Sequence, residues 1–134
     1  MTGLLRQLLR FALVGLANTA VGLGAIFAVM FFLETGPAMA NAIGYAFGLA
    51  VSFTLNRGWT FSDKGRAAVL LPRFLLVVGI AYLLNLGTVL GIVARFPDSG
   101  YLAQVLGVTV YTVCAFAGCR WLVFTSGQRD IVEA

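Results

Sequence analysis

The sequence predicts an all-α membrane protein whose four transmembrane helices form two tandem repeated hairpins in a single domain, residues 1–134. The chain is 60% hydrophobic and only 10% charged, whereas soluble domains carry about 25% charged residues. About 20 apolar residues span the hydrocarbon layer of a bilayer. Four runs near that length occupy residues 11–33, 37–55, 74–94 and 101–124. A soluble core does not need four such runs, and one domain is expected at this length.

The first apolar run follows Arg6 and Arg10, as the apolar segment of a secretory signal peptide would. Its length is too great for a signal peptide, and no convincing small-residue cleavage site follows it. We therefore expect it to remain as a transmembrane helix. Short turns at residues 34–36 and 96–100, marked by Gly, Pro, Asp and Ser, join the first run to the second and the third to the fourth.

The second and fourth runs end in the same pattern, an arginine between two phenylalanines at four-residue spacing. The pattern occupies residues 53–61 and returns 63 residues later at residues 116–124. The same offset carries Arg10 onto Arg73. Each half of the chain is therefore predicted to be one helical hairpin that begins at Arg-Phe and ends at Arg-aromatic.

The basic residues indicate how the helices are oriented in the membrane. Of the nine Lys and Arg residues, all but Arg95 precede the first run, lie between the second and third, or lie at or beyond the end of the fourth. The positive-inside rule then places both termini and the middle loop in the cytoplasm. The net charge of +4 is a topology signal, and no nucleic-acid partner is expected.

Four amide side chains lie within the apolar runs, where an unpaired polar group is costly. At 1.5 Å per residue, Asn18 lies about 12 Å and Asn85 about 18 Å into the membrane from the preceding arginine. Asn41 and Gln104 share one repeat position near the far surface. As contacts between helices, such amides contribute about 0.6 kcal/mol each. As a set facing the bundle interior, they predict a polar path.

The residue types favour neither catalysis nor metal binding. The chain has no His, and none of its acidic residues lies inside a span, which argues against a proton-coupled exporter. Cys114 and Cys119 lie five residues apart on one helix and point in different directions, so they cannot form a disulfide. We therefore expect no enzyme activity, no metal and no cofactor.

Four arginines share one level at the cytoplasmic boundary and could converge in a bundle: Arg10, Arg57, Arg73 and Arg120. A guanidinium binds phosphate oxygens through a bidentate fork, which suits a lipid phosphate. Arg57 and Arg120 also end helices, where the helix dipole favours a cation. Alternatively, these arginines only set topology and extend to the membrane surface, with Trp59 and Trp121 as an interfacial belt.

Several motifs follow one another along nearly the whole chain. They are Arg10-Phe11-x2-Val14-Gly15-x2-Asn18-Thr19, Ser52-Phe53-x2-Asn56-Arg57-x-Trp59-x-Phe61, Arg73-Phe74, Asn85, Ala103-Gln104 and Arg120-Trp121-x2-Phe124. Together they resemble the GtrA-like family of small bacterial membrane proteins. The resemblance implies four transmembrane helices in the bacterial cytoplasmic membrane and a role in cell-surface polysaccharide synthesis. Asn56, beside Arg57 in this motif, is assigned to the polar path.

The resemblance implies two alternative functions. Members are commonly proposed to flip a polyprenyl-phosphate-linked sugar to the outer leaflet. Here the four boundary arginines would hold the phosphate, and the amides would offer hydrogen bonds to the sugar. Other members are thought to anchor or recruit a glycosyltransferase without moving a substrate. Because four helices enclose little space for a hydrated sugar, we also expect a homo-oligomer, most simply a dimer.

Overall fold

The computed structural model describes residues 3–126, and over these residues the chain is helical apart from short connections. The elements are α1 (Gly3–Leu33), α2 (Pro37–Leu55), η1 (Asn56–Thr60), α3 (Ala67–Arg95), α4 (Gly100–Gly118) and η2 (Cys119–Val123). The segments η1 and η2 are π-helical. All four α-helices are long and apolar enough to cross a membrane, which confirms the predicted all-α membrane fold. Arg129, one of the basic residues used to predict topology, lies outside the described residues.

The first helix of each pair extends beyond its apolar run. Helix α1 begins at Gly3 and α3 at Ala67, so Arg10 and Arg73 lie within regular helix instead of preceding it. Arg and Leu are both good helix formers, and α3 continues through Pro72 even though proline cannot donate the intrahelical hydrogen bond. The two arginines therefore project from fixed helical turns beside the apolar surface.

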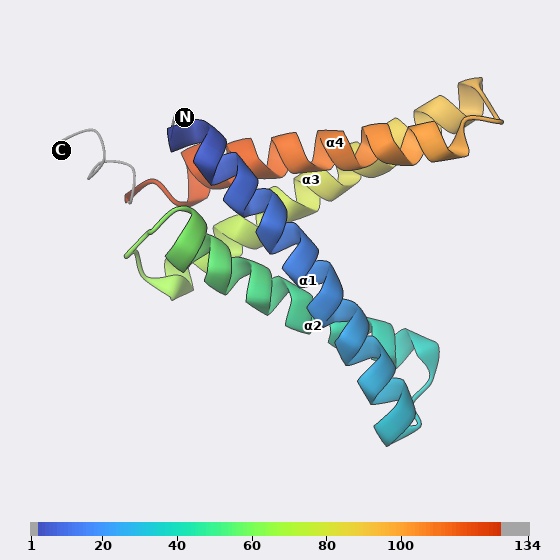
Figure 1. The fold of residues 1–134 in the computed structure, drawn as a ribbon, viewed down its shortest axis with the longest axis horizontal. Coiled ribbons are helices and arrows are strands. Elements are labelled where there is room, and N and C mark those ends of the chain that lie inside the picture. The colour runs from blue at the N-terminus through green and yellow to red at the C-terminus, as the bar shows by residue number, and fades with distance from the viewer. Residues whose placement is uncertain (1–2, 127–134) are drawn as a thin grey trace. The chain divides into compact units, whose positions relative to one another are not determined.

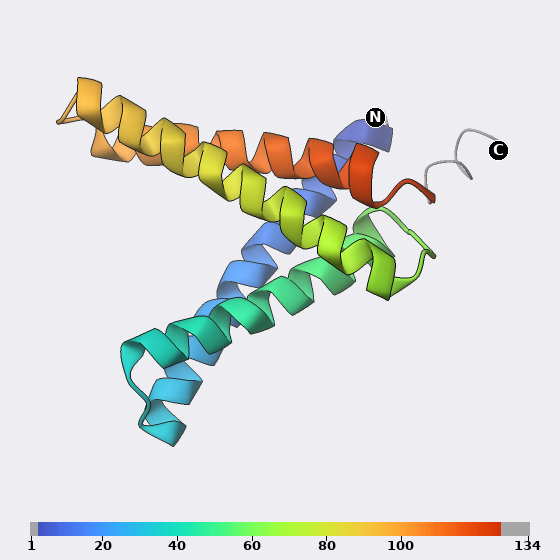
Figure 2. The same ribbon diagram turned by 180° about the vertical axis from the view of Figure 1, so that it is seen from behind.

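The chain divides into two compact units, Met1–Lys64 and Gly65–Ala134. We call them the first and second hairpins. In the first, α1 and α2 run antiparallel and pack along each other, with η1 continuing α2 (Figure 1). In the second, α3 and α4 pack in the same way, with η2 continuing α4 (Figure 2). The residue Glu34, in the turn between α1 and α2, adopts a left-handed backbone conformation (φ 49°).

The hairpins bury small residues between their helices and expose large apolar ones. Ala40, Gly44 and Gly48 are buried in α2, and Ala103 and Gly107 are buried in α4. Leucine and phenylalanine side chains along all four helices are mostly exposed. This arrangement suits a membrane, because lipid tails solvate apolar side chains and helices associate through small residues.

The helix contact has the same register in both hairpins. A Cβ atom on Gly44 would lie 2.7 Å from the carbonyl oxygen of Gly22 and would also meet the side chain of Ile26. A Cβ atom on Gly107 would meet Asn85 and Val89, and each member of this second set lies 63 residues after its counterpart. The residues at the helix contact are therefore related by the same 63-residue offset as the sequence pattern, and the repeat itself stays a prediction.

Candidate functional site

The end of each hairpin that carries its paired arginines is called here its basic end: Arg10 and Arg57 in the first hairpin, Arg73 and Arg120 in the second. In both, the last helix widens into a π-helical turn. The Phe61 N–H donates to the carbonyl oxygen of Asn56 at 2.9 Å, and the Phe124 N–H to that of Cys119 at 2.8 Å. These bonds join residues five apart, the pattern of a π-helix, which is rare and frequent at functional sites.

A pair of phenylalanine rings fastens each π-helical segment to the first helix of its hairpin. The Phe11 and Phe61 ring centroids lie 6.2 Å apart. Those of Phe74 and Phe124 lie 6.3 Å apart. Such aromatic pairs add about 0.5–1.5 kcal/mol beyond their buried area. The second phenylalanine of each sequence pattern, Phe61 or Phe124, therefore packs against the first helix of its hairpin just after the turn that carries the arginine.

Arg57 and Arg120, two of the predicted phosphate ligands, occupy matching positions in η1 and η2. Both side chains are partly buried, and the Nε atom of each is buried. Each lies in the last turn of its helix, where the negative end of the helix dipole favours a cation. The two hairpins therefore present equivalent cations in equivalent surroundings.

Arg10 and Arg73 share a repeat position but differ in their surroundings. Arg10 donates from Nη1 to the carbonyl oxygen of Trp59 at 2.9 Å, and its guanidinium carbon lies 5.1 Å from the centroid of the Trp59 ring. Arg73 is exposed. Leu122 stands at the repeat position of Trp59, and the other predicted interfacial tryptophan, Trp121, is exposed. One boundary arginine is thus held by an aromatic side chain, and its counterpart extends from the surface.

Of the five residues predicted for the polar path, the four amides within the apolar runs do not gather at one place within either hairpin. Asn18 packs against Gly48 and Asn85 against Gly107, so both lie at the helix contact of their own hairpin. The Oδ1 atom of Asn85 is buried and, within residues 3–126, has no hydrogen-bond partner. Asn41 and Gln104, by contrast, are exposed.

A further set of polar side chains is buried at the basic end of the first hairpin: Gln7, Asn56 and Thr60. The Asn56 Nδ2 group donates to the hydroxyl oxygen of Ser52 at 3.2 Å. Of the three, only Asn56 was predicted as a site residue. Gln7 and Thr60 lie outside the apolar runs, where a polar residue is unremarkable in sequence, and only packing shows that they are buried. Asp63, also buried, donates its backbone N–H to the carbonyl oxygen of Arg57 at 2.8 Å.

The model for the transmembrane domain of the GtrA/DPMS family matches residues 10–124. The chain belongs to this family. The matched residues of this GtrA/DPMS protein begin at Arg10 and end at Phe124, so they include both ring pairs and both π-helical segments. The four long apolar helices and the family together show that the chain is a multi-pass membrane protein.

The chain is similar in sequence to the bactoprenol-linked glucose translocase of Salmonella phage P22. This relative is 25% identical to the GtrA/DPMS chain over 132 residues, which cover 96% of the chain and 99% of the relative. No solved structure matches the chain.

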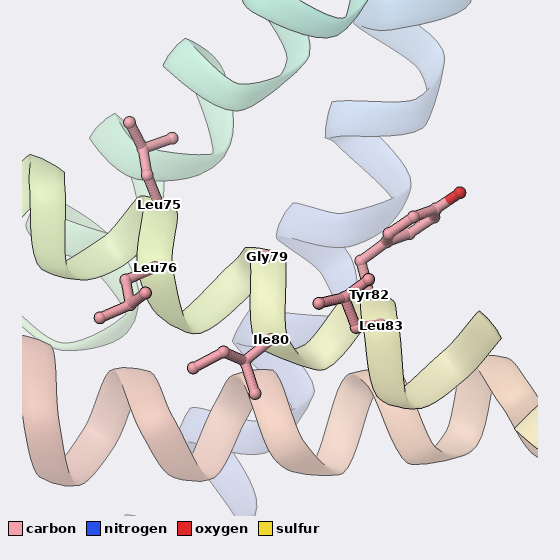
Figure 3. Close-up of a pocket in the computed structure, with 6 residues that line it drawn as sticks. All are labelled: Leu75, Leu76, Gly79, Ile80, Tyr82 and Leu83. Carbon is pink, nitrogen blue, oxygen red and sulfur yellow. The ribbon is translucent and has the colours of Figure 1, made fainter. Parts of the chain in front are cut away.

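An apolar groove runs along α3 of this GtrA/DPMS protein (Figure 3). It is lined by Leu75, Leu76, Gly79, Ile80, Tyr82 and Leu83. Figure 3 shows the Tyr82 hydroxyl directed away from the helix. The groove offers hydrocarbon contact and no cation, so it suits a lipid chain and not a phosphate.

Proposed function

We propose that this GtrA/DPMS protein moves a polyprenyl-phosphate-linked sugar across the bacterial cytoplasmic membrane for modification of cell-surface polysaccharide or lipopolysaccharide. The observation that supports this most directly is the named activity of the phage relative, which aligns over almost the full length of both chains. The protein acts as a carrier and not as an enzyme. With no ATP-binding motif in its sequence, it equilibrates the lipid down its gradient.

The arginines of the two basic ends hold the phosphate in this proposal. Arg57 and Arg120 bind it directly, since each guanidinium can donate two parallel hydrogen bonds to phosphate oxygens. Arg10 and Arg73, which share a repeat position, attract the anionic lipid. The matching placement of Arg57 and Arg120 in two π-helical segments supports this assignment.

The polar path and the membrane topology are further parts of the proposal. The distribution of basic residues supports cytoplasmic termini, with Trp59 and Trp121 at the interface. Asn41 and Gln104, exposed at the opposite ends of the hairpins, hydrogen-bond the sugar as it leaves. Asn18 and Asn85, packed against glycines, chiefly hold helices together.

Two partners complete the proposal. A second copy of the chain would enlarge the space available to the sugar, because a four-helix protein encloses little of its own. A glycosyltransferase that uses the transferred lipid would dock on the exposed apolar helix faces. If no lipid is transferred, recruitment of that enzyme becomes the protein's main role.

Replacing each phosphate arginine by lysine tests the proposal, because lysine keeps the charge but loses the fork. Binding of a short polyprenyl-phosphate glucose would be measured for purified wild type, Arg57→Lys and Arg120→Lys, with leaflet transfer measured in liposomes. Each substitution should weaken binding about ten- to a hundredfold, the equivalent of one lost charge-assisted hydrogen bond.

The matched control is Arg95→Lys, which changes an exposed arginine at the opposite end of α3 and should leave binding and transfer unchanged. Equal affinities for wild type, Arg57→Lys and Arg120→Lys would show that these two arginines do not bind the phosphate. Tight binding without any transfer by the wild type would favour the glycosyltransferase-recruiting role.

A further inference from the structure

Three polar side chains at the basic end of the first hairpin are buried with unsatisfied oxygen atoms. Gln7, Asn56 and Thr60 are 9%, 1% and 2% exposed. In the described part of the chain, Oε1 of Gln7, Oδ1 of Asn56 and Oγ1 of Thr60 have no hydrogen-bond partner. Most buried polar groups in native proteins are paired. Three unsatisfied oxygens at one end of one hairpin are therefore a candidate binding site.

The contacts between α1 and η1 bring these side chains to the same end of the hairpin. Gln7 shares the buried stripe of α1 with Phe11 and Val14. Asn56 and Thr60 are the first and last residues of η1. The edge-to-face contact between Phe11 and Phe61 and the hydrogen bond from Arg10 to Trp59 hold α1 against η1 at this point.

The second hairpin shows that the fold does not require polar residues at these positions. Sixty-three residues later, the counterparts of Gln7, Asn56 and Thr60 are apolar and equally buried: Leu70, Cys119 and Val123, at 6%, 0% and 0% exposed. Ser52, which accepts from Asn56, is replaced by the buried Ala115. The second hairpin forms the same π-helical turn and the same ring pair with this apolar set. Formation of the turn and the ring pair therefore does not require the polar side chains of Gln7, Asn56 and Thr60.

The chemistry of the unsatisfied atoms identifies the ligand group. The amide oxygens of Gln7 and Asn56 can only accept hydrogen bonds, and the Asn56 amide is oriented by the bond from its Nδ2 to Ser52. An ionised phosphate offers only acceptors, so it cannot satisfy them. A sugar offers several hydroxyl donors on adjacent carbons.

We infer that the basic end of the first hairpin is the sugar-recognition site, in which Gln7, Asn56 and Thr60 accept hydrogen bonds from sugar hydroxyls. This inference rests on the proposed function and extends it, because it assigns the sugar to one hairpin while both hairpins supply phosphate arginines. The oxygens are covered in this structure, so the sugar enters when η1 separates from α1.

Exchanging residues between the hairpins tests the site. Thr60→Val and Gln7→Leu place in the first hairpin the residues that the second carries, and Val123→Thr is the mirror control. The probes are polyprenyl phosphates carrying glucose, galactose or mannose, and polyprenyl phosphate alone. Each first-hairpin substitution should weaken binding of the preferred sugar lipid about three- to tenfold, which corresponds to the loss of one neutral hydrogen bond. The affinity for polyprenyl phosphate without a sugar should not change.

Val123→Thr should change neither affinity. Because Thr60→Val preserves shape, it carries the test if Gln7→Leu does not fold, and Thr60→Ser should restore sugar binding. Unchanged discrimination between sugar lipid and bare lipid in Thr60→Val overturns the inference, as does an equal loss for both probes or a wild type that prefers no sugar lipid. A wild type that discriminates but does not transfer lipid overturns the proposed function and leaves the sugar site standing.

Discussion

The two hairpins share their framework and differ in what they bury at the basic end. Both have a π-helical turn that carries an arginine, followed by a phenylalanine whose ring pairs with one on the first helix. The first hairpin fills the space around this framework with polar side chains, and its Arg10 is held on Trp59. The second fills it with apolar side chains, and Arg73 is exposed. The framework is therefore independent of the polarity around it, which leaves one hairpin able to carry a specific polar site.

The hairpins also differ in how closely their helices approach. At Gly44 an added Cβ atom would meet the side chain of Ile26 and also a backbone atom, the carbonyl oxygen of Gly22, at 2.7 Å. At Gly107 an added Cβ atom would meet the side chains of Asn85 and Val89, and the nearest backbone atom, the carbonyl oxygen of Asn85, lies farther away, at 3.3 Å. Side chains can rotate away from an added methyl group, whereas a backbone carbonyl moves only if the helix moves. The first hairpin should therefore be the less tolerant of larger residues.

The largest expected effect is a difference in stability between Gly44→Ala and Gly107→Ala. Overpacking typically costs about 1–3 kcal/mol. We expect Gly44→Ala near the upper end of this range and Gly107→Ala near the lower end, measured by denaturant unfolding in detergent micelles. Gly24→Ala and Gly87→Ala are matched controls, since a Cβ atom at either position meets nothing within 4 Å. An equal or greater cost for Gly107→Ala would contradict the comparison.

A smaller effect is expected from Trp59→Leu, which gives the first hairpin the residue of the second at this position. The substitution removes the ring beneath Arg10 but keeps the backbone carbonyl that accepts its hydrogen bond. Loss of an exposed cation–π contact costs about 0.5–1 kcal/mol, so binding of polyprenyl phosphate should weaken about two- to fivefold. Leu122→Trp, at an exposed position, should not weaken it. Equal losses in both variants would show that the contact between Arg10 and Trp59 is not what matters.

The smallest effect is expected from Asn85→Ala and Asn18→Ala. Both amides pack against glycines at helix contacts, and an amide in such a contact contributes about 0.6 kcal/mol on average. Either substitution should change unfolding stability by no more than this and should leave lipid transfer in liposomes intact. If a variant of unchanged stability no longer transferred lipid, the result would show that its amide contacts the sugar during transfer.

Much of the fold could be predicted from the sequence because the membrane imposes a length and a polarity on each helix. Runs of about 20 apolar residues have few alternatives to spanning helices, and residues 11–33 and 74–94 lie inside α1 and α3. The repeated Phe-x3-Arg-x3-Phe pattern likewise indicated that Arg57 and Arg120 are equivalent. The four-residue spacing did not reveal the π-helical turns, because the same spacing is typical of an ordinary α-helix.

The sequence by itself determined the four spanning helices, the positions of the boundary arginines and the family. Only the tertiary structure decided which polar residues are buried. In the structure Gln7 and Thr60 are buried, whereas Asn41 and Gln104 are exposed. Asn85 lies against Gly107. In a soluble helix an apolar stripe marks the face that packs, but a membrane helix is apolar all round and carries little such signal. The packed face is set instead by where small residues let two backbones approach, and that depends on both helices at once.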